Sequence, residues 1–188
     1  VAGAMACKFR NAGQVCVCVN RFYIQDGIYE QFVTRLAAEV KKLKVGNGMD
    51  EGVNLGPLIN SAGVKKVEDH VKDALAKGGR LLAGGERHAL GGNFFQPTVI
   101  AEATEEMKVA SEETFGPLAA CFRFKTEEEV IERANNTPFG LAAYFYTQNL
   151  KRVFRVSETL ESGMIGINDS SVSTELAPFG GVKESGLG

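Results

Sequence analysis

The chain has 188 residues, and its 21 Lys and Arg against 23 Asp and Glu give a formal net charge of −2 at pH 7. This near balance argues against a nucleic-acid partner, because nucleic-acid-binding domains carry an excess of basic residues. Hydrophobic residues make up 44% and charged residues 23% of the chain, which excludes a disordered, collagenous or coiled-coil protein. No apolar run approaches the roughly 18 residues of a membrane span, and no secretory signal is visible, so no membrane partner is expected.

The cysteine and histidine counts limit the chemistry further. Four cysteines are too few for a disulfide framework and are typical of a reducing compartment, so we expect a cytoplasmic location. Only His70 and His88 are present, which argues against a multi-histidine metal site, and we expect no bound metal. The chain begins at Val1 and stops at Gly188 within a Gly-rich run, which indicates a piece of a longer polypeptide.

The first half of the chain alternates predicted helices with short strands. Residues 1–10 have small and apolar side chains at helical spacing and predict the end of a helix. Residues 21–25 predict a strand. Residues 27–43 predict an amphipathic helix with Asp26 as its N-cap, and residues 61–77 predict a second amphipathic helix that ends before two glycines.

The apolar faces of these two amphipathic helices predict which side of each is buried, because residues three or four positions apart share a face. In the first helix the apolar face is formed by Ile28, Phe32, Leu36, Val40 and Leu43. In the second helix it is formed by Val64, Val67, Val71 and Leu75. His70 lies among Lys and Asp residues of the second helix, so we expect its side chain on the surface.

The second half of the chain continues the alternation. Apolar strands are predicted at 80–85, 94–102, 118–124, 141–147 and 164–168. Thr126 begins a TEEE run that has the form of a capping box, and another helix is predicted between Leu150 and Gly163. Helices that alternate with apolar strands favour a mostly parallel sheet covered on both faces. We therefore predict a three-layer α/β/α fold, with residues 1–188 forming one domain.

Cys16 is the residue with the clearest chemical potential. It follows a predicted helix end and a turn at Gly13, a place where a thiol can be exposed. Exposure and thiolate character make a cysteine a nucleophile, whereas the alternative reading is a small buried hydrophobic side chain. The generic phosphate-binding, zinc-protease and C-x-x-C motifs do not occur in the chain.

Three segments together resemble the motifs of the aldehyde dehydrogenase superfamily. FRNAGQVC at 9–16 resembles the family's nucleophile motif, EETFGP at 112–117 the motif that contacts the nicotinamide ribose, and APFGGVKESGLG at 177–188 the segment lining the substrate tunnel. They follow the family's order across essentially the whole chain. Within the family, KFRNAGQVCVCVNRFYIQ and VGNGMDEGVNLGPLIN are most similar to the succinate-semialdehyde dehydrogenases.

The resemblance implies a fold and a reaction for these motifs. It implies the family's catalytic domain, an open α/β/α sheet, and the oxidation of succinate semialdehyde to succinate with NAD or NADP. Cys16 would be the nucleophile that forms a thiohemiacetal and then a thioester, and its backbone N–H would form part of an oxyanion hole. Glu113 would hydrogen-bond the nicotinamide ribose, and Phe115 would pack near the nicotinamide ring.

The same resemblance implies how the substrate carboxylate is bound. Arg10 matches the arginine that grips this carboxylate in the subfamily, a role suited to a bidentate guanidinium. Ser173 matches the serine that donates a hydroxyl to the same group, although Ser171 and Thr174 are alternatives at that place. Phe179 would form a wall of the tunnel.

Cys18 lies two residues after the proposed nucleophile, and we hypothesise a reversible Cys16–Cys18 disulfide that switches the enzyme off under oxidation. The alternative is that Cys18 only fills space. Residues two apart on a strand are about 6.6 Å apart, near the upper limit for a disulfide, so the hypothesis needs a bent backbone. We interpret Cys7 and Cys121 as packing residues of a helix and a strand.

The family's general-base glutamate and its coenzyme domain precede the nucleophile segment, so we expect the isolated chain to have little dehydrogenase turnover. The expected partner is a small aldehyde that carries a carboxylate, and the family implies a homodimer or homotetramer. Glutarate semialdehyde and general aldehydes remain alternative substrates, because one methylene changes discrimination by only about 1–3 kcal/mol. The alternative of another class is a non-catalytic thiol-switch or interaction domain.

Overall fold

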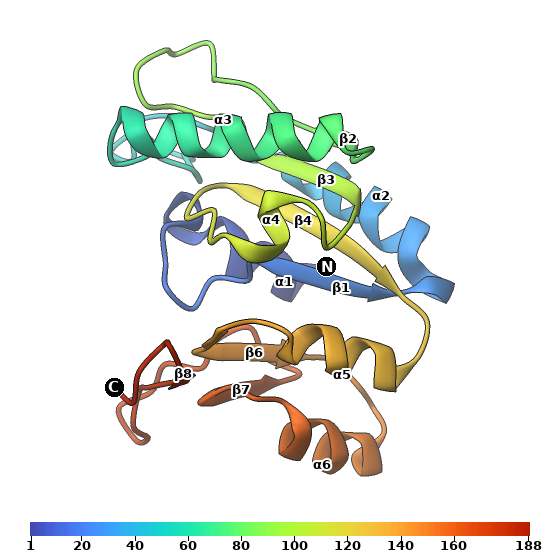
Figure 1. Ribbon diagram of the computed structural model, residues 1–188. Coiled ribbons are helices and arrows are strands. Elements are labelled where there is room, and N and C mark those ends of the chain that lie inside the picture. The colour runs from blue at the N-terminus through green and yellow to red at the C-terminus, as the bar shows by residue number, and fades with distance from the viewer. The chain divides into compact units, whose positions relative to one another are not determined.

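A computed structural model describes residues 1–188, which divide into two units, Val1–Phe124 and Lys125–Gly188 (Figure 1). Each unit has its own strands and helices and is described by itself. The helices are α1 (Ala2–Phe9), α2 (Tyr29–Val40), α3 (Ser61–Ala76), α4 (Lys108–Ser111), α5 (Glu127–Asn135) and α6 (Leu150–Thr159). The strands are β1 (Arg21–Gln25), β2 (Arg80–Ala83), β3 (Thr98–Ala103), β4 (Leu118–Phe124), β5 (Phe139–Gly140), β6 (Ala142–Phe145), β7 (Met164–Ile167) and β8 (Val182–Lys183).

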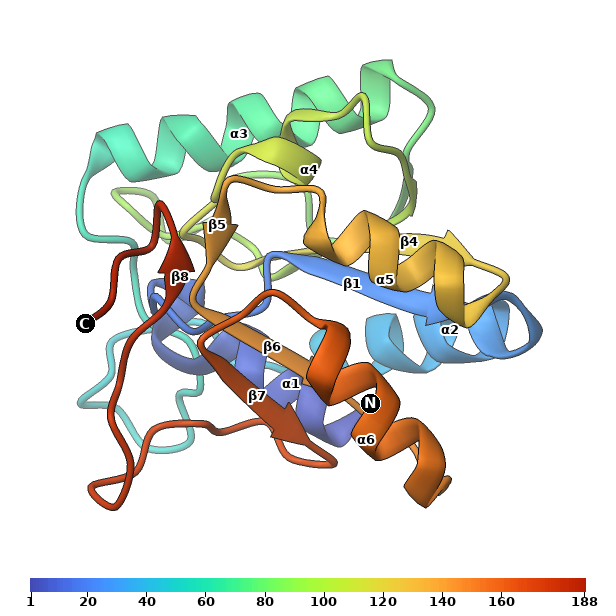
Figure 2. The ribbon, with the colours of Figure 1, turned by 60° about the horizontal axis from the view of Figure 1, so that its bottom comes forward.

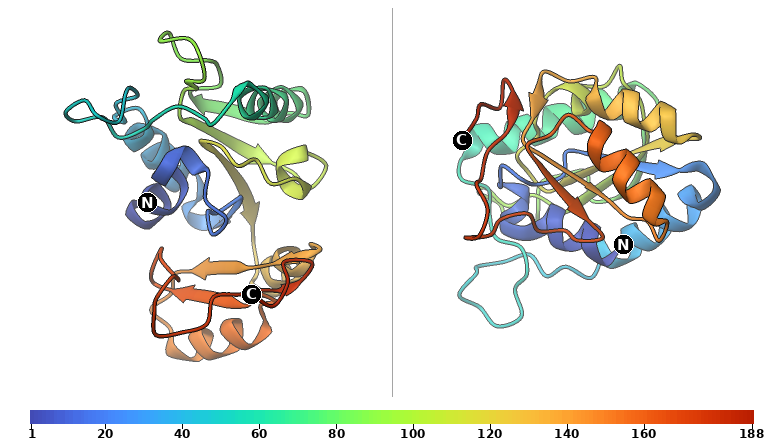
Figure 3. Two further views of the ribbon diagram at one scale, coloured as in Figure 1. Left: turned by 90° about the vertical axis from the view of Figure 1, so that its left-hand side faces the viewer. Right: turned by 90° about the horizontal axis from the view of Figure 1, so that it is seen from below.

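The first unit is built on a four-stranded sheet in the order β1-β4-β3-β2. Strand β4 pairs in parallel with both β1 and β3, whereas the edge strand β2 is antiparallel to β3. Helices α1 and α2 lie on one face of this sheet and α3 and α4 on the other (Figure 3, left). The predicted three-layer α/β fold with a mostly parallel sheet is confirmed, and β2 is its antiparallel member.

The core of this unit is centred on β4. The first five residues of that strand, 118–122, are buried, because β1 and β3 flank it and helices cover both faces. A strand enclosed in this way is apolar on both sides rather than alternating. The predicted strand at 118–124 is confirmed residue for residue.

Two details of the amphipathic helices differ from the prediction. Helix α2 begins at Tyr29, after a 3-10 turn at Asp26–Ile28, so Ile28 is exposed and Tyr29 is buried in its place. Asp26 does not cap the helix, because its carboxylate pairs with Arg123 instead. In α3 the buried face passes through Ala74, which leaves Leu75 at its edge and exposed.

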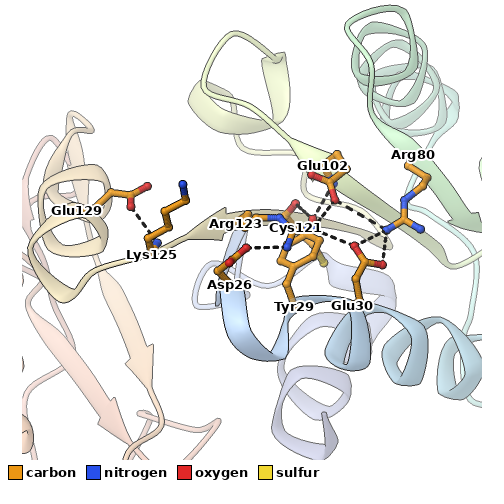
Figure 4. A network of polar contacts seen from close by, with 9 residues as sticks. All are labelled: Asp26, Tyr29, Glu30, Arg80, Glu102, Cys121, Arg123, Lys125 and Glu129. Carbon is orange, nitrogen blue, oxygen red and sulfur yellow. Dashed lines mark hydrogen bonds and ion pairs between the residues drawn. The ribbon is translucent and has the colours of Figure 1, made fainter.

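A polar network holds α2 to the carboxyl ends of the parallel strands (Figure 4). The guanidinium of Arg123, on β4, pairs with Asp26, Glu30 and Glu102 at 2.8–2.9 Å. It also lies over the ring of Tyr29, 3.9 Å from the centroid. The carboxylates are largely exposed, so each pair alone contributes little to stability, and the geometry of the whole network matters more.

Tyr29 is the buried member of this network. Its hydroxyl donates to the carbonyl oxygen of Cys121 at 2.9 Å and accepts from the backbone N–H of Glu102 at 2.7 Å. Burial raises the pKa of Tyr29 to about 12, so the hydroxyl keeps its proton. The side chain therefore ties α2 to both β3 and β4 at the point where the backbone of Glu102 departs from regular pairing.

The second unit contains two small sheets. Strands β6 and β7 pair in parallel and β5 pairs with β8 in antiparallel fashion (Figure 2). Thr126 and Asn149 cap helices α5 and α6, because their side chains accept from backbone N–H groups of the first turn at 3.2 and 3.0 Å. The predicted cap at Thr126 and the strands within 141–147 and 164–168 are confirmed.

One carboxylate joins the two helices of this unit. Glu127 at the start of α5 accepts from Arg152 and Arg155 of α6. These guanidinium groups hold the pKa of Glu127 at about 2. No helix in either unit has both the length and the apolar character that a membrane crossing requires.

Candidate active site

The topology of the first unit brings two motifs, FRNAGQVC at 9–16 and EETFGP at 112–117, to the same end of the sheet. The segment around Cys16 leads into β1, and the segment around Glu113 leads into β4. These strands are parallel neighbours, with Arg21 opposite Ala120. The amino ends of β1 and β4 therefore lie side by side, and the two motifs approach the sheet together.

The chain between α1 and Cys16 makes a sharp turn. Asn11, Ala12 and Gly13 have φ values of 49°, 54° and 75°, so three successive residues lie in the left-handed region. Residues with a Cβ adopt this region only at a cost in free energy, and they keep it when the surroundings enforce it. The turn ends the helix where the FRNAG sequence predicts and leaves Cys16 exposed just beyond it.

Gly13 brings the two motifs into direct contact. A Cβ placed on Gly13 would lie 2.2 Å from the carbonyl oxygen of Gly116 and 2.7 Å from its carbonyl carbon. Gly116 is enclosed in turn, since a Cβ there would lie 2.3 Å from a methyl carbon of Val67 on α3. The loop that carries Cys16, the EETFGP segment and α3 are therefore packed together without room for a methyl group between them.

Gln14 anchors the loop that carries Cys16 to a second loop. Its side-chain oxygen accepts from the backbone N–H of Ile59 at 2.8 Å, and its side-chain nitrogen donates to the carbonyl oxygen of Asn11 at 3.1 Å. A single amide thus joins the left-handed turn to the loop that precedes α3.

Asn20 holds the EETFGP segment through hydrogen bonds in a similar way, and it was not among the predicted site residues. Its side-chain nitrogen donates to the carbonyl oxygens of Val109 and Glu112 at 3.0 and 3.1 Å, and its side-chain oxygen accepts from the N–H of Thr114 at 3.0 Å. Asn20 stands immediately before β1, so it ties the start of that strand to the segment before β4. Its position four residues after Cys16 was the only signal available in the sequence.

His70 is buried, with 1% of its surface exposed, so the prediction of a surface residue was wrong. Its ring nitrogens lie 3.0 Å from the Thr114 hydroxyl and 3.2 Å from the Glu112 carboxylate. The Lys and Asp neighbours that suggested exposure lie on the other faces of α3, whereas His70 shares the face of Val67 and Val71. Burial lowers the pKa of His70, against the opposing effect of Glu112.

The four thiols fall into two classes, as expected. Cys7 and Cys121 are buried and pack within α1 and β4. Cys16 is exposed, and Cys18 is half-buried with its thiol 3.5 Å from the carbonyl oxygen of Lys8. All four cysteines are free thiols in this structure.

Three other predicted site residues of this unit present their side chains to solvent. Arg10 is exposed, and its guanidinium pairs with no carboxylate of the described chain. Glu113 is exposed, and Phe115 has a φ of 50° and 41% of its surface exposed. Glu113 and Phe115, two positions apart in the EETFGP segment, therefore present a carboxylate and an aromatic ring to solvent.

The remaining predicted site residues belong to the second unit. Ser173 and Phe179 are exposed, as is the alternative Ser171, whereas the hydroxyl of Thr174 accepts from the N–H of Leu176 at 3.3 Å. Next to Phe179, the APFGG segment folds back on the end of the chain. A Cβ on Gly180 would lie 2.2 Å from the carbonyl oxygen of Leu187.

We expect the substitution Gly13→Ala to destabilise the first unit by about 2–4 kcal/mol, since it combines a left-handed φ with overpacking against Gly116. The measurement is denaturant unfolding of both proteins. Gly27→Ala is the control, because a Cβ on Gly27 meets no atom within 4 Å and its φ is not left-handed. Equal stability of the Gly13 and Gly27 variants would contradict the packing described above.

The lowered pKa of His70 gives stability a definite pH dependence. Its unfolded-state pKa is about 6.5, so as pH falls through that value the unfolded chain takes up a proton that the folded chain resists. Stability should therefore fall between about pH 7.5 and about pH 5.5, and His70→Phe should show a smaller fall than the unchanged protein. Denaturant unfolding of both proteins at both pH values measures the two falls in the free energy of unfolding. His88 is present in both proteins, so its contribution cancels in the comparison. An equal or larger fall in the variant would contradict this prediction.

Comparison with known proteins places this architecture. The model of the aldehyde dehydrogenase family matches residues 1–188. The chain is 62% identical to 3-sulfolactaldehyde dehydrogenase of Pseudomonas putida and 58% identical to the NADP-dependent succinate-semialdehyde dehydrogenase of Escherichia coli, in each case over all of this chain and 39% of the relative. The crystal structure of succinate-semialdehyde dehydrogenase from Burkholderia pseudomallei superposes with a TM-score of 0.98 at 59% identity, over all of this chain and 39% of that one. The chain thus spans about two fifths of the length of these relatives, and it belongs to the aldehyde dehydrogenase family.

Proposed function

We propose that this chain is the nucleophile-bearing part of an NAD- or NADP-dependent dehydrogenase that oxidises succinate semialdehyde to succinate. The observation that carries the proposal is the exposed Cys16, which is held by the Gly13–Gly116 contact beside the segment that carries Glu113. Relatives at 58% identity in Escherichia coli and Acinetobacter baylyi are succinate-semialdehyde dehydrogenases, which supports the substrate.

The chemistry assigned to Cys16 proceeds through a covalent adduct. The thiolate attacks the aldehyde carbon, a C–S bond forms, and the carbonyl electron pair moves onto oxygen to give a thiohemiacetal. The backbone N–H of Cys16 donates to that oxygen and stabilises its negative charge. Loss of a hydride from the adduct leaves a thioester, and water cleaves the C–S bond to release the acid and regenerate the thiolate.

NAD or NADP, when bound, supplies the acceptor for that hydride. Glu113 would hold the ribose of the nicotinamide half through its carboxylate, which accepts hydrogen bonds from sugar hydroxyls. Phe115 would offer its ring to the nicotinamide. Both cofactors occur among the relatives: the Escherichia coli enzyme is NADP-dependent, and an aldehyde dehydrogenase of Bacillus cereus, 37% identical, has a structure with NAD⁺.

Arg10 is the group proposed to select the substrate. Its guanidinium is exposed and uncommitted, so it is available to a carboxylate at the far end of the aldehyde. Ser173 would add a hydroxyl donor, and Phe179 an apolar wall.

Two relatives extend the range of candidate substrates. A glutarate-semialdehyde dehydrogenase of Pseudomonas aeruginosa is 56% identical, and the 3-sulfolactaldehyde dehydrogenase is 62% identical. Both names describe aldehydes that carry an acidic group, carboxylate or sulfonate, and a guanidinium binds either anion. Glutarate semialdehyde and 3-sulfolactaldehyde are therefore the second candidate substrates.

The 188 residues alone are proposed to give little turnover, because they correspond to about two fifths of each relative and the resemblance places the general-base glutamate before the nucleophile segment. A homodimer or homotetramer is proposed for the protein at full length. Cys18 is proposed to form a reversible disulfide with Cys16. The supporting observations are that both are free thiols and that Cys16 is exposed.

Replacing the nucleophile tests the reaction directly. In the protein at the full length of its relatives, Cys16→Ser should lower kcat at least about 1000-fold, since a hydroxyl is a far weaker nucleophile than a thiolate. The measurement is steady-state reduction of NAD and NADP with succinate semialdehyde. Cys18→Ser should keep turnover, and after mild peroxide its intact mass should show no loss of two hydrogens, the change that a Cys16–Cys18 disulfide gives the unchanged protein. Normal turnover by Cys16→Ser would contradict the assigned mechanism.

Replacing Arg10 tests the substrate. Arg10→Ala should lower kcat/KM for succinate semialdehyde about 10–100-fold, the loss of one charge-assisted interaction, and leave an uncharged aldehyde of similar length nearly unaffected. Arg35→Ala is the control, because Arg35 is an exposed arginine of α2 in the same unit. Measuring glutarate semialdehyde and 3-sulfolactaldehyde alongside ranks the candidate substrates. An equal loss for charged and uncharged aldehydes would remove Arg10 from substrate selection.

A further inference from the structure

The residues on either side of Glu113 are held differently from Glu113 itself. Glu112 has extended backbone angles, φ −107° and ψ 134°, and successive side chains of an extended segment point to opposite sides. The Glu112 carboxylate and the Thr114 hydroxyl both contact His70, whereas Glu113 is exposed. One buried ring therefore binds the side chains at both positions that flank the proposed ribose ligand.

Burial favours the neutral form of the His70 ring, in which one ring nitrogen donates a hydrogen bond and the other accepts one. An ionised carboxylate only accepts hydrogen bonds, so Nε2 of His70, 3.2 Å from Glu112, must donate. Nδ1, 3.0 Å from Thr114, then accepts from the threonine hydroxyl. A neutral imidazole satisfies both contacts.

Asn20 and His70 restrain the segment in different ways. Asn20 binds only backbone atoms, at Val109, Glu112 and Thr114, which fixes the path of the segment. His70 binds the side chains of Glu112 and Thr114, which fixes the rotation of the segment about its own axis. Rotation of the segment is the movement that would turn Glu113 away from its ligand.

We propose that His70 is a positioning residue for cofactor binding, which holds Glu112 and Thr114 so that the carboxylate of Glu113 faces the nicotinamide ribose. The proposal rests on the proposed function of Glu113 and adds a residue from α3, about 40 positions earlier in the chain, to the requirements of that site. His70 itself touches neither substrate nor cofactor in this scheme.

The test measures binding of reduced cofactor by its nicotinamide fluorescence, in the protein at the full length of its relatives. His70→Phe keeps a flat ring and removes both polar contacts, and it should raise the Kd about tenfold, the equivalent of one lost hydrogen bond. Thr114→Val removes the hydroxyl contact with His70 at nearly unchanged side-chain volume, so it should also raise the Kd. His70→Gln, which retains a donor and an acceptor, should recover part of the affinity. His88→Phe, in a loop of the same unit, is the control.

A double substitution separates positioning from a general effect on the fold. In a Glu113→Ala background, His70→Phe should cause no further rise in Kd, because the residue that it positions is gone. A rise of the same size in that background would overturn the proposal, as would an unchanged Kd in His70→Phe. In steady state, the KM for cofactor should rise while the KM for aldehyde stays constant.

The same measurements distinguish this proposal from the one on which it rests. If Glu113→Ala raises the Kd and His70→Phe does not, the ribose role of Glu113 stands and the positioning role of His70 fails. If Glu113→Ala leaves the Kd unchanged, the ribose role itself fails, and the positioning role fails with it.

Discussion

The contact between Gly13 and Gly116 is the constraint on which the site depends. The separation of 2.2 Å between a Cβ on Gly13 and the Gly116 carbonyl oxygen means that two loops, 103 positions apart in the chain, meet backbone to backbone. One loop carries Cys16 and the other carries Glu113. Because neither loop can move toward the other and Val67 closes the stack from α3, the distance between the two motifs is set by packing and needs no ligand to establish it.

This contact lies at the amino ends of the parallel strands, whereas open α/β sheets usually bind ligands at the carboxyl ends. Here the carboxyl ends of β1, β3 and β4 are occupied by the network of Arg123, Tyr29 and their acidic partners (Figure 4). The loops at the amino ends are held by side-chain amides and one imidazole, from Gln14, Asn20 and His70. The carboxyl end of the sheet thus carries the polar network. The amino end carries two loops that are held by hydrogen bonds but leave Cys16 and Glu113 exposed.

Local patterns in the sequence predict most of the longer elements and the exposure of Cys16, but they do not reveal the residues that support the candidate site. The strand at 118–124 and the cap at Thr126 follow from local patterns, and both are confirmed. Asp26 failed as a cap because Arg123, 97 positions away, competes for its carboxylate. The roles of His70 and Asn20 also depend on distant parts of the chain. Each binds a segment more than 40 positions away, and nothing near them in the sequence indicates that segment.

The candidate site combines exposed side chains with neighbouring residues that are held by packing and hydrogen bonds. Cys16, Arg10 and Glu113 are exposed. The residues next to them are committed: Gly13 by contact, Gln14 by hydrogen bonds to two backbone groups, and Thr114 by bonds from both its side chain and its backbone. A ligand that binds at such a site orders the exposed side chains but not the backbone of the loops that carry them, so more of its interaction energy appears as affinity. The left-handed turn and the buried histidine therefore hold the neighbours of these exposed residues in place and leave the exposed side chains themselves free.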